Sequence, residues 1–177
     1  MRSIRISVAL VLAACGIAPS LWAQSAPPDF RQEFSGQFGA SARKLVALAE
    51  AMPAASYDWQ PMEGVASVAR VYMHIARYNY MYPDQNLGMG APVAYAGFEE
   101  EITEKDEALE ILAESMSHVR RVLDAMSDED LEAPTRLYGR DVGKWAVLLQ
   151  LVTHMNEHLG QSIAYARMNR VVPPWSR

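Results

Sequence analysis

Two histidines, His154 and His158, lie four residues apart near the C-terminus, inside a stretch with helical periodicity over residues 144–169. On an α-helix, residues four apart are separated by about 40° around the axis, so both imidazoles share one face. A neutral imidazole nitrogen binds divalent transition metals, and two of them on one rigid helix lose little conformational entropy on binding an ion. The spacing therefore predicts two metal ligands, with a third to come from elsewhere in the chain.

The alternative is that both histidines are ordinary helix residues, satisfied by neighbouring groups or by solvent. The apolar pattern of the helix favours burial of the pair. Leaving a polar ring unpaired in a core costs about 1–3 kcal/mol, so two adjacent buried imidazoles need a common partner, and a metal ion is one. The narrow stripe that the two histidines share also contains Val147, Leu151, Gln161 and Tyr165.

The 177 residues, half of them apolar and a fifth charged, predict one globular domain. Residues 1–23 have the pattern of an export signal peptide, with a basic start (Arg2 and Arg5), an apolar stretch over 6–17 and a small residue, Ala23, before the expected cut. The apolar stretch is too short for a good membrane span. Residues 24–177 are then the mature domain, and we expect a periplasmic or extracellular location.

A lipobox ending at Cys15 is an alternative to cleavage after Ala23, and it would give a lipid-anchored protein. Cys15 is the only cysteine, so cysteine nucleophiles, disulfides and thiolate metal sites are excluded from the mature domain. Removal of residues 1–23 takes away two arginines and changes the formal net charge from −5 to −7. An acidic chain without a basic stripe argues against a nucleic-acid partner.

Apolar periodicity predicts four long helices, and no segment alternates as a strand does. Ser67 is expected to cap the second helix, and Thr103, with Asp106 three residues on, the third. Residues 83–101 are expected to form a loop at a functional edge or a lid over the site, and residues 132–143 a linker. The fold class is therefore all-α, an antiparallel four-helix bundle, with helices over 29–52, 67–82, 103–126 and 144–169.

The second and fourth helices of such a bundle can face each other, which would bring His74 opposite His154 and His158. Three imidazoles bind a divalent metal and leave coordination positions open to water or substrate. Zinc and nickel suit such ligands best, and iron and manganese are compatible with them. The fourth histidine, His118, is expected at the surface or boundary of the third helix, outside the site.

The chain resembles the DinB-like (DinB/YfiT) superfamily over essentially all of its mature part, through residues 57–61, 67–76, 154–161 and 165–167. The resemblance implies a four-helix bundle, commonly dimeric, with a metal site at His74, His154 and His158. Some members of the superfamily are S-transferases or isomerases that depend on bacillithiol, mycothiol or related thiols. Because these thiols are mainly cytoplasmic, the export signal of this chain weakens the transferase interpretation.

Residues 154–158 also match H-x-x-E-H, the inverted zinc-protease motif, in which the glutamate is the base. That motif needs an acidic ligand downstream, and no Asp or Glu follows Glu157. The protease interpretation is therefore disfavoured. Glu157 is a candidate proton acceptor beside the metal, the alternative being a solvated surface glutamate. Gln161 and Tyr165 either line the pocket and orient a ligand or pack in the core.

The leading hypothesis is an exported metalloenzyme, a hydrolase or transferase, that acts on a small molecule through a metal held by His74, His154 and His158. The alternative is a non-catalytic metal-binding or stress-associated helical bundle. A homodimer is expected in either case. The sequence identifies neither the substrate nor the reaction.

Overall fold

The computed structural model describes residues 30–176, so the expected signal peptide with Cys15, and Asp29 at the start of the first expected helix, lie outside the described residues. The described part is mostly helical, which confirms the all-α class. A π-helical turn follows α2 over Pro83–Leu87, and two short 3₁₀ turns cover Ala54–Ser56 and Pro174–Ser176. The α-helices are α1 (Phe30–Ala51), α2 (Val68–Tyr82), α3 (Phe98–Glu101), α4 (Lys105–Ala125), α5 (Asp128–Glu132) and α6 (Lys144–Met168).

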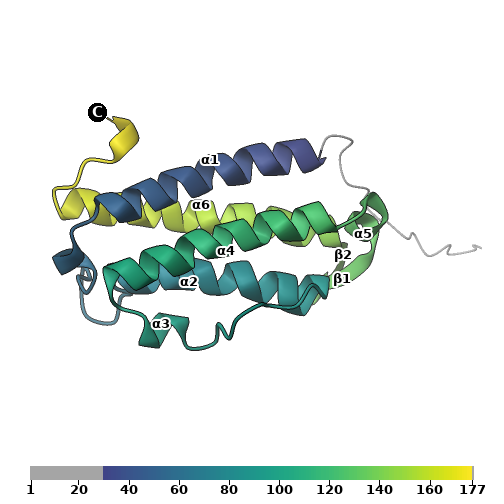
Figure 1. The fold of residues 1–177 in the computed structure, drawn as a ribbon, viewed down its shortest axis with the longest axis horizontal. Helices are drawn as coiled ribbons and strands as arrows, with labels where there is room; N and C mark the ends of the chain where they lie inside the picture. Colours follow the sequence, from purple (N-terminus) through teal and green to yellow (C-terminus); the bar gives the residue numbers. More distant parts are fainter. Residues whose placement is uncertain (1–29, 177) are drawn as a thin grey trace, which may run out of the picture.

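The four long helices α1, α2, α4 and α6 lie side by side around one apolar core (Figure 1). Phe30 packs on Trp145 where α1 and α6 both begin, so these two helices run parallel. Helices α2 and α6 run antiparallel, because the Tyr165 hydroxyl near the end of α6 reaches the Ala66 carbonyl just before α2. Helices α2 and α4 run parallel, since the segment between them crosses back along the bundle (Figure 1). The expected bundle thus combines antiparallel neighbours, such as α2 and α6, with two pairs of parallel neighbours.

The start of α2 is capped as expected, because the Ser67 hydroxyl accepts a hydrogen bond from the backbone amide of Arg70 at 3.2 Å. The expected Thr103 cap on the third long helix is wrong. Helix α4 begins after Glu104 without a side-chain cap. Instead, the Lys105 ammonium donates to the carbonyls of Glu50 and Met52 at 2.7 and 2.8 Å, so a contact with the end of α1 fixes the start of α4.

The expected linker over 132–143 is wrong as well, because it contains a β-hairpin of β1 (Pro134–Leu137) and β2 (Arg140–Gly143). Tyr138 and Gly139 form the turn with positive φ angles of 50° and 77°, as a two-residue hairpin turn of type I′ requires. The strands are short and mostly polar, so they have no alternating pattern to detect. Tertiary contacts hold β1 in place, since the Thr135 hydroxyl donates to the Asn86 carbonyl at 2.6 Å.

His118, expected at the surface or boundary of its helix, is buried with 7% of its surface exposed. Its ring packs on Tyr80 of α2, with ring centroids 4.9 Å apart. Helix α2 covers this part of α4, because Asn79 of α2 donates to the Ser115 hydroxyl at 3.1 Å one turn before His118. Burial, together with nearby Arg121, lowers the pKa of His118 below its ordinary value. His118 is therefore a core residue outside the histidine cluster.

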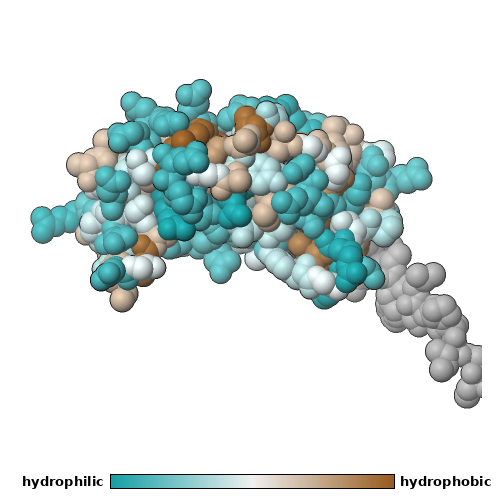
Figure 2. Space-filling view, turned by 90° about the horizontal axis from the view of Figure 1, so that it is seen from below, coloured by the Kyte–Doolittle hydropathy of each residue, from teal (hydrophilic) through white to brown (hydrophobic). Residues whose placement is uncertain are grey.

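Within residues 30–176, no helix combines the length and the hydropathy that crossing a bilayer requires. On the face drawn in Figure 2, hydrophilic residues predominate and hydrophobic ones form separate patches. The larger exposed apolar side chains are spread over several elements, and include Met62, Tyr138, Leu149 and Met168.

Replacing Arg31 by alanine should lower the free energy of unfolding by about 1.5–3 kcal/mol, the range for hydrogen bonds made by charged groups. The Arg31 guanidinium donates to the carbonyls of Leu123 and Met126 at the end of α4, which would lose a partner. Urea unfolding of Arg31→Ala and Arg43→Ala measures this, because Arg43 is an exposed arginine of the same helix. Equal effects of the two substitutions would contradict the capping role of Arg31.

Candidate metal centre

The structure brings together the three histidines expected to be ligands. His74 lies in the middle of α2, and His154 and His158 lie one turn apart on the side of α6 that faces α2. The ring centroids are 5.0 Å apart for His74 and His154, 4.8 Å for His74 and His158, and 4.6 Å for His154 and His158. Donor nitrogens of all three rings lie within 4.8 Å of one another. The three rings are therefore close enough together that they could hold one metal ion.

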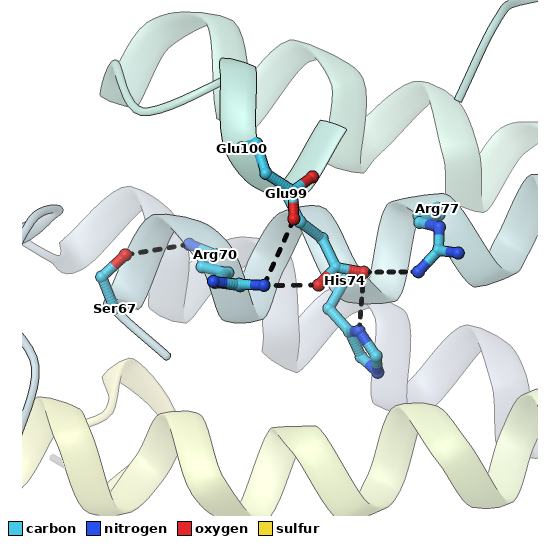
Figure 3. Close-up of polar contacts among 6 residues, drawn as sticks. All are labelled: Ser67, Arg70, His74, Arg77, Glu99 and Glu100. Atoms are coloured by element: carbon cyan, nitrogen blue, oxygen red, sulfur yellow. Dashed lines mark hydrogen bonds and ion pairs between the residues drawn. The ribbon is translucent and has the colours of Figure 1, made fainter. Parts of the chain in front are cut away.

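The His74 ring is oriented by a carboxylate that the sequence did not single out. Nδ1 of His74 lies 2.9 Å from Oε1 of Glu99, and an ionised carboxylate only accepts, so Nδ1 carries the proton. The lone pair is therefore on Nε2, and Figure 3 shows the second ring nitrogen pointing towards α6. A metal-ligating histidine usually donates its other N–H to an oxygen in this way.

His158 is oriented in the same way by residues of its own helix. Its Nδ1 lies 2.8 Å from the Gln161 side-chain oxygen, and the Gln161 amide donates to the Tyr165 hydroxyl at 3.0 Å. The Tyr165 hydroxyl in turn donates to the backbone carbonyl of Ala66 at 3.1 Å, which ties the chain of hydrogen bonds to the start of α2. Gln161 thus orients a candidate ligand, and Tyr165 supports Gln161 from the core.

His154 differs from the other two, because both of its ring nitrogens are buried and neither has a hydrogen-bond partner among residues 30–176. Burial, with added repulsion from His158 and His74, lowers the pKa of His154 to about 3. The ring is neutral at physiological pH and has a lone pair to donate. A single unpartnered ring nitrogen does not identify a metal site, since Nε2 of His118 also lacks a partner within the described chain. At His154, however, two further imidazoles lie within reach of the same ion.

Glu99 lies on α3, in the segment that the sequence predicted as a loop or lid, and its side chain is only 10% exposed. Its Oε1 also accepts from the Arg77 guanidinium at 2.9 Å, and its Oε2 lies 3.6 Å from Nε of Arg70 (Figure 3). Burial alone would raise the pKa of Glu99, but the hydrogen bonds from Arg77 and His74 outweigh it and lower the pKa below its ordinary value. The carboxylate therefore stays ionised beside His74.

A pocket of about 440 Å³ opens beside the cluster, and His74 and His158 line it while His154 does not. Tyr78 lies on another side of the cluster, with its ring centroid 4.6 Å from that of His74 and 4.5 Å from that of His154. The cluster is thus covered by the Tyr78 ring on one side and opens to the pocket on another. The other residues lining the pocket are Gln60, Gly64, Val65, Ala66, Arg70, Val71, Glu99 and Gln161.

Glu157, the candidate proton acceptor, is exposed on α6 and is not among the residues that line this pocket. Its suggested role beside the metal stays a prediction. Glu99 is the carboxylate that the structure places against the cluster. In the sequence, Glu99 stands out only as part of the short acidic run 99–101. That run does not indicate that one of its carboxylates contacts His74.

Comparison with known proteins places the chain in a helical fold that has been solved before. The family model of the DinB superfamily matches residues 37–166, well over half of the chain and including all three histidines. The structure of a DinB-like protein from Bacillus cereus is similar with a TM-score of 0.69 at 18% identity, over 82% of this chain and 93% of that one. For a DinB-like protein from Bacillus subtilis the TM-score is 0.63 at 18% identity, over 79% and 93%. No curated protein matches the chain.

Metal-free protein should lose stability as the pH falls below about 6.5, because His154 binds a proton in the unfolded chain and resists it in the folded one. One such group contributes a slope of at most about 1.4 kcal/mol per pH unit, down towards pH 3. Urea unfolding of chelator-treated protein between pH 7 and 5 should give a shallower slope for His154→Leu than for wild type. Above pH 7.5 the ring is neutral in both states, so His154 adds no slope there, and parallel curves throughout would refute the prediction.

Proposed function

The chain belongs to the DinB superfamily, and from its histidine cluster we propose that it binds one divalent metal ion through His74, His154 and His158. The observation that carries the proposal is His154, whose two buried nitrogens have no partner within residues 30–176. Two imidazoles with engaged Nδ1 atoms lie beside it, which is the arrangement of ligands held ready for a metal. An ion bound there would satisfy His154, both of whose ring nitrogens lack a partner within the described residues.

An all-imidazole donor set favours zinc or nickel, and iron or manganese would also be accepted. Three protein ligands leave at least one coordination position for an exchangeable group, as in catalytic rather than structural zinc sites. A metal at such a site acts as a Lewis acid and lowers the pKa of bound water towards about 7. The three histidines would hold the ion, while Glu99 and Gln161 orient two of them and a pocket adjoins the cluster.

The proposed activity is that of a metal-dependent enzyme, a hydrolase or a transferase, acting on a small molecule. The pocket of about 440 Å³ is within the range that small-molecule sites occupy, and it is lined by both apolar and polar groups. Arg70, Gln60 and Gln161 supply donors at its wall for an oxygen-containing substrate. A homodimer is part of the proposal and would be measured by sedimentation.

Export is also part of the proposal, and it rests on the pattern of residues 1–23 alone. Intact mass spectrometry of the protein purified from an exporting bacterial host should give a mature chain that begins at Gln24. A diacylated chain beginning at Cys15 would instead establish a lipid anchor, and an uncut chain found in the cytoplasm would refute export. Cys15→Ser is the matched control, because it removes the lipobox and leaves the Ala23 site intact.

Metal analysis by inductively coupled plasma mass spectrometry should give about one metal ion per chain for wild-type protein purified without chelator. His154→Ala should retain less than roughly a tenth of it, because it removes one of three ligands. His118→Ala is the matched control, a buried histidine outside the cluster, and should retain the full amount. Full occupancy in His154→Ala, or no metal in wild type, would show that the cluster is not a metal site.

A further inference from the structure

We propose that Glu99 is a positioning residue of the metal site and that its contact with His74 couples metal binding to the docking of α3 on α2. The inference rests on the proposed metal site and adds a residue that the ligand set does not contain. It is based on one carboxylate oxygen that accepts hydrogen bonds from two residues. Oε1 of Glu99 is 2.9 Å from Nδ1 of His74 and 2.9 Å from a guanidinium nitrogen of Arg77.

The first step concerns the orientation of His74. Because the carboxylate accepts only, it fixes the Nδ1–H tautomer and prevents the ring from turning over, which keeps Nε2 on the side of α6 (Figure 3). Arg77 holds the carboxylate, so Glu99 is itself restrained. The side chain of His74 is 27% exposed, and without this contact the ring would be free to make other hydrogen bonds.

The second step concerns what metal binding does to this contact. When Nε2 donates its lone pair to a cation, electron density is drawn from the ring and Nδ1–H becomes a stronger hydrogen-bond donor. A stronger donor facing an ionised carboxylate gives a stronger, charge-assisted hydrogen bond. Metal binding should therefore tighten the contact between His74 and Glu99.

The third step concerns α3, which has four residues and none that is buried. Besides Glu99, α3 packs Phe98 against the apolar core, with its ring centroid 6.0 Å from that of Tyr80, and Glu100 pairs with Arg70 at 3.2 Å. The side chains of that ion pair are 60% and 50% exposed, and pairs of this kind contribute little. Glu99, with a side chain only 10% exposed, is therefore the less exposed of the two charged contacts of α3 with α2, and short segments with so little buried surface open readily.

Linkage makes the two effects reciprocal. If docked α3 increases the affinity for the metal through Glu99, the metal must increase the docking of α3 by the same factor. Loss of a hydrogen bond to a metal-bound histidine typically costs about 10–100-fold in metal affinity. The same factor should then appear in the opening of α3.

The test uses the full mature protein and three variants: Glu99→Ala, Glu99→Gln and the neighbouring Glu100→Ala. Zn²⁺ affinity is measured by competition with a chromophoric chelator. We expect Glu99→Ala to bind Zn²⁺ about 10–100-fold more weakly, and Glu99→Gln to fall between it and wild type, because its amide oxygen still accepts from Nδ1. Glu100→Ala should stay within about threefold, since Glu100 pairs only with Arg70 among the contacts described.

Two further readouts separate positioning from general stabilisation. The visible absorption of Co²⁺-loaded protein should change in Glu99→Ala and be largely restored in Glu99→Gln. Zn²⁺ should slow hydrogen exchange at the amides of Glu101 and Ile102, which bond to the Gly97 and Phe98 carbonyls within the α3 turn. We expect this protection in wild type and Glu100→Ala, and expect Glu99→Ala to lose it.

The failures of the two proposals are distinguishable. Wild type that binds no Zn²⁺ overturns the metal site and this inference together. Wild type that binds Zn²⁺ while Glu99→Ala binds it equally well, with an unchanged Co²⁺ spectrum, overturns the role of Glu99 alone. A Glu99→Ala variant that loses only thermal stability, equally with and without metal, shows that Glu99 is structural and likewise overturns the inference.

Discussion

A neutral imidazole buried without a hydrogen-bond partner constrains much of the structure around it. His154 lies between α2 and α6, where water cannot satisfy its nitrogens and no group within residues 30–176 does so. The neighbouring rings are each fixed from outside, one by Glu99 and the other by Gln161. Because those outer contacts use the Nδ1 atoms, the remaining lone pairs are left for the interior of the cluster. The three rings are therefore arranged so that they could hold one divalent metal ion.

The bundle supplies the geometry that this constraint needs. Antiparallel packing of α2 against α6 sets the middle of one helix opposite the middle of the other. The hydrogen bond from Tyr165 to Ala66 fixes the relative position of the two helices near one end. The candidate ligands are thus held by secondary structure, and the residues that orient two of them come from α6 itself and from the short helix α3.

The parts of the site that could be predicted are those determined by local periodicity. His154 and His158 are on one helix, so their spacing alone places them together, and the apolar stripe around them indicates which way they point. His74 required a bundle to be assumed, because its neighbours in the cluster are 80 and 84 residues away in the chain. The helical class followed from the same periodicity and is confirmed by the fold and the family.

What could not be predicted depends on contacts between distant segments. Glu99 lies on a helix too short to have a periodic pattern, and only its contacts with α2 give it a role. The hairpin over 134–143 is polar and is held by the turn after α2. His118 lies between Ser117 and Val119, with Arg120 next, and its burial results from the way α2 lies across α4. In each case the neighbours of a residue in space, and not those in sequence, decide its environment.

The unequal burial of the three histidines gives the cluster an outer and an inner part. His74 and His158 are half-buried and line the pocket, whereas His154 is buried behind them. A divalent ion held by the three rings would have to pass the two outer rings before it reached His154. The rates at which the site loads and releases an ion would then depend on how easily water reaches the innermost ring.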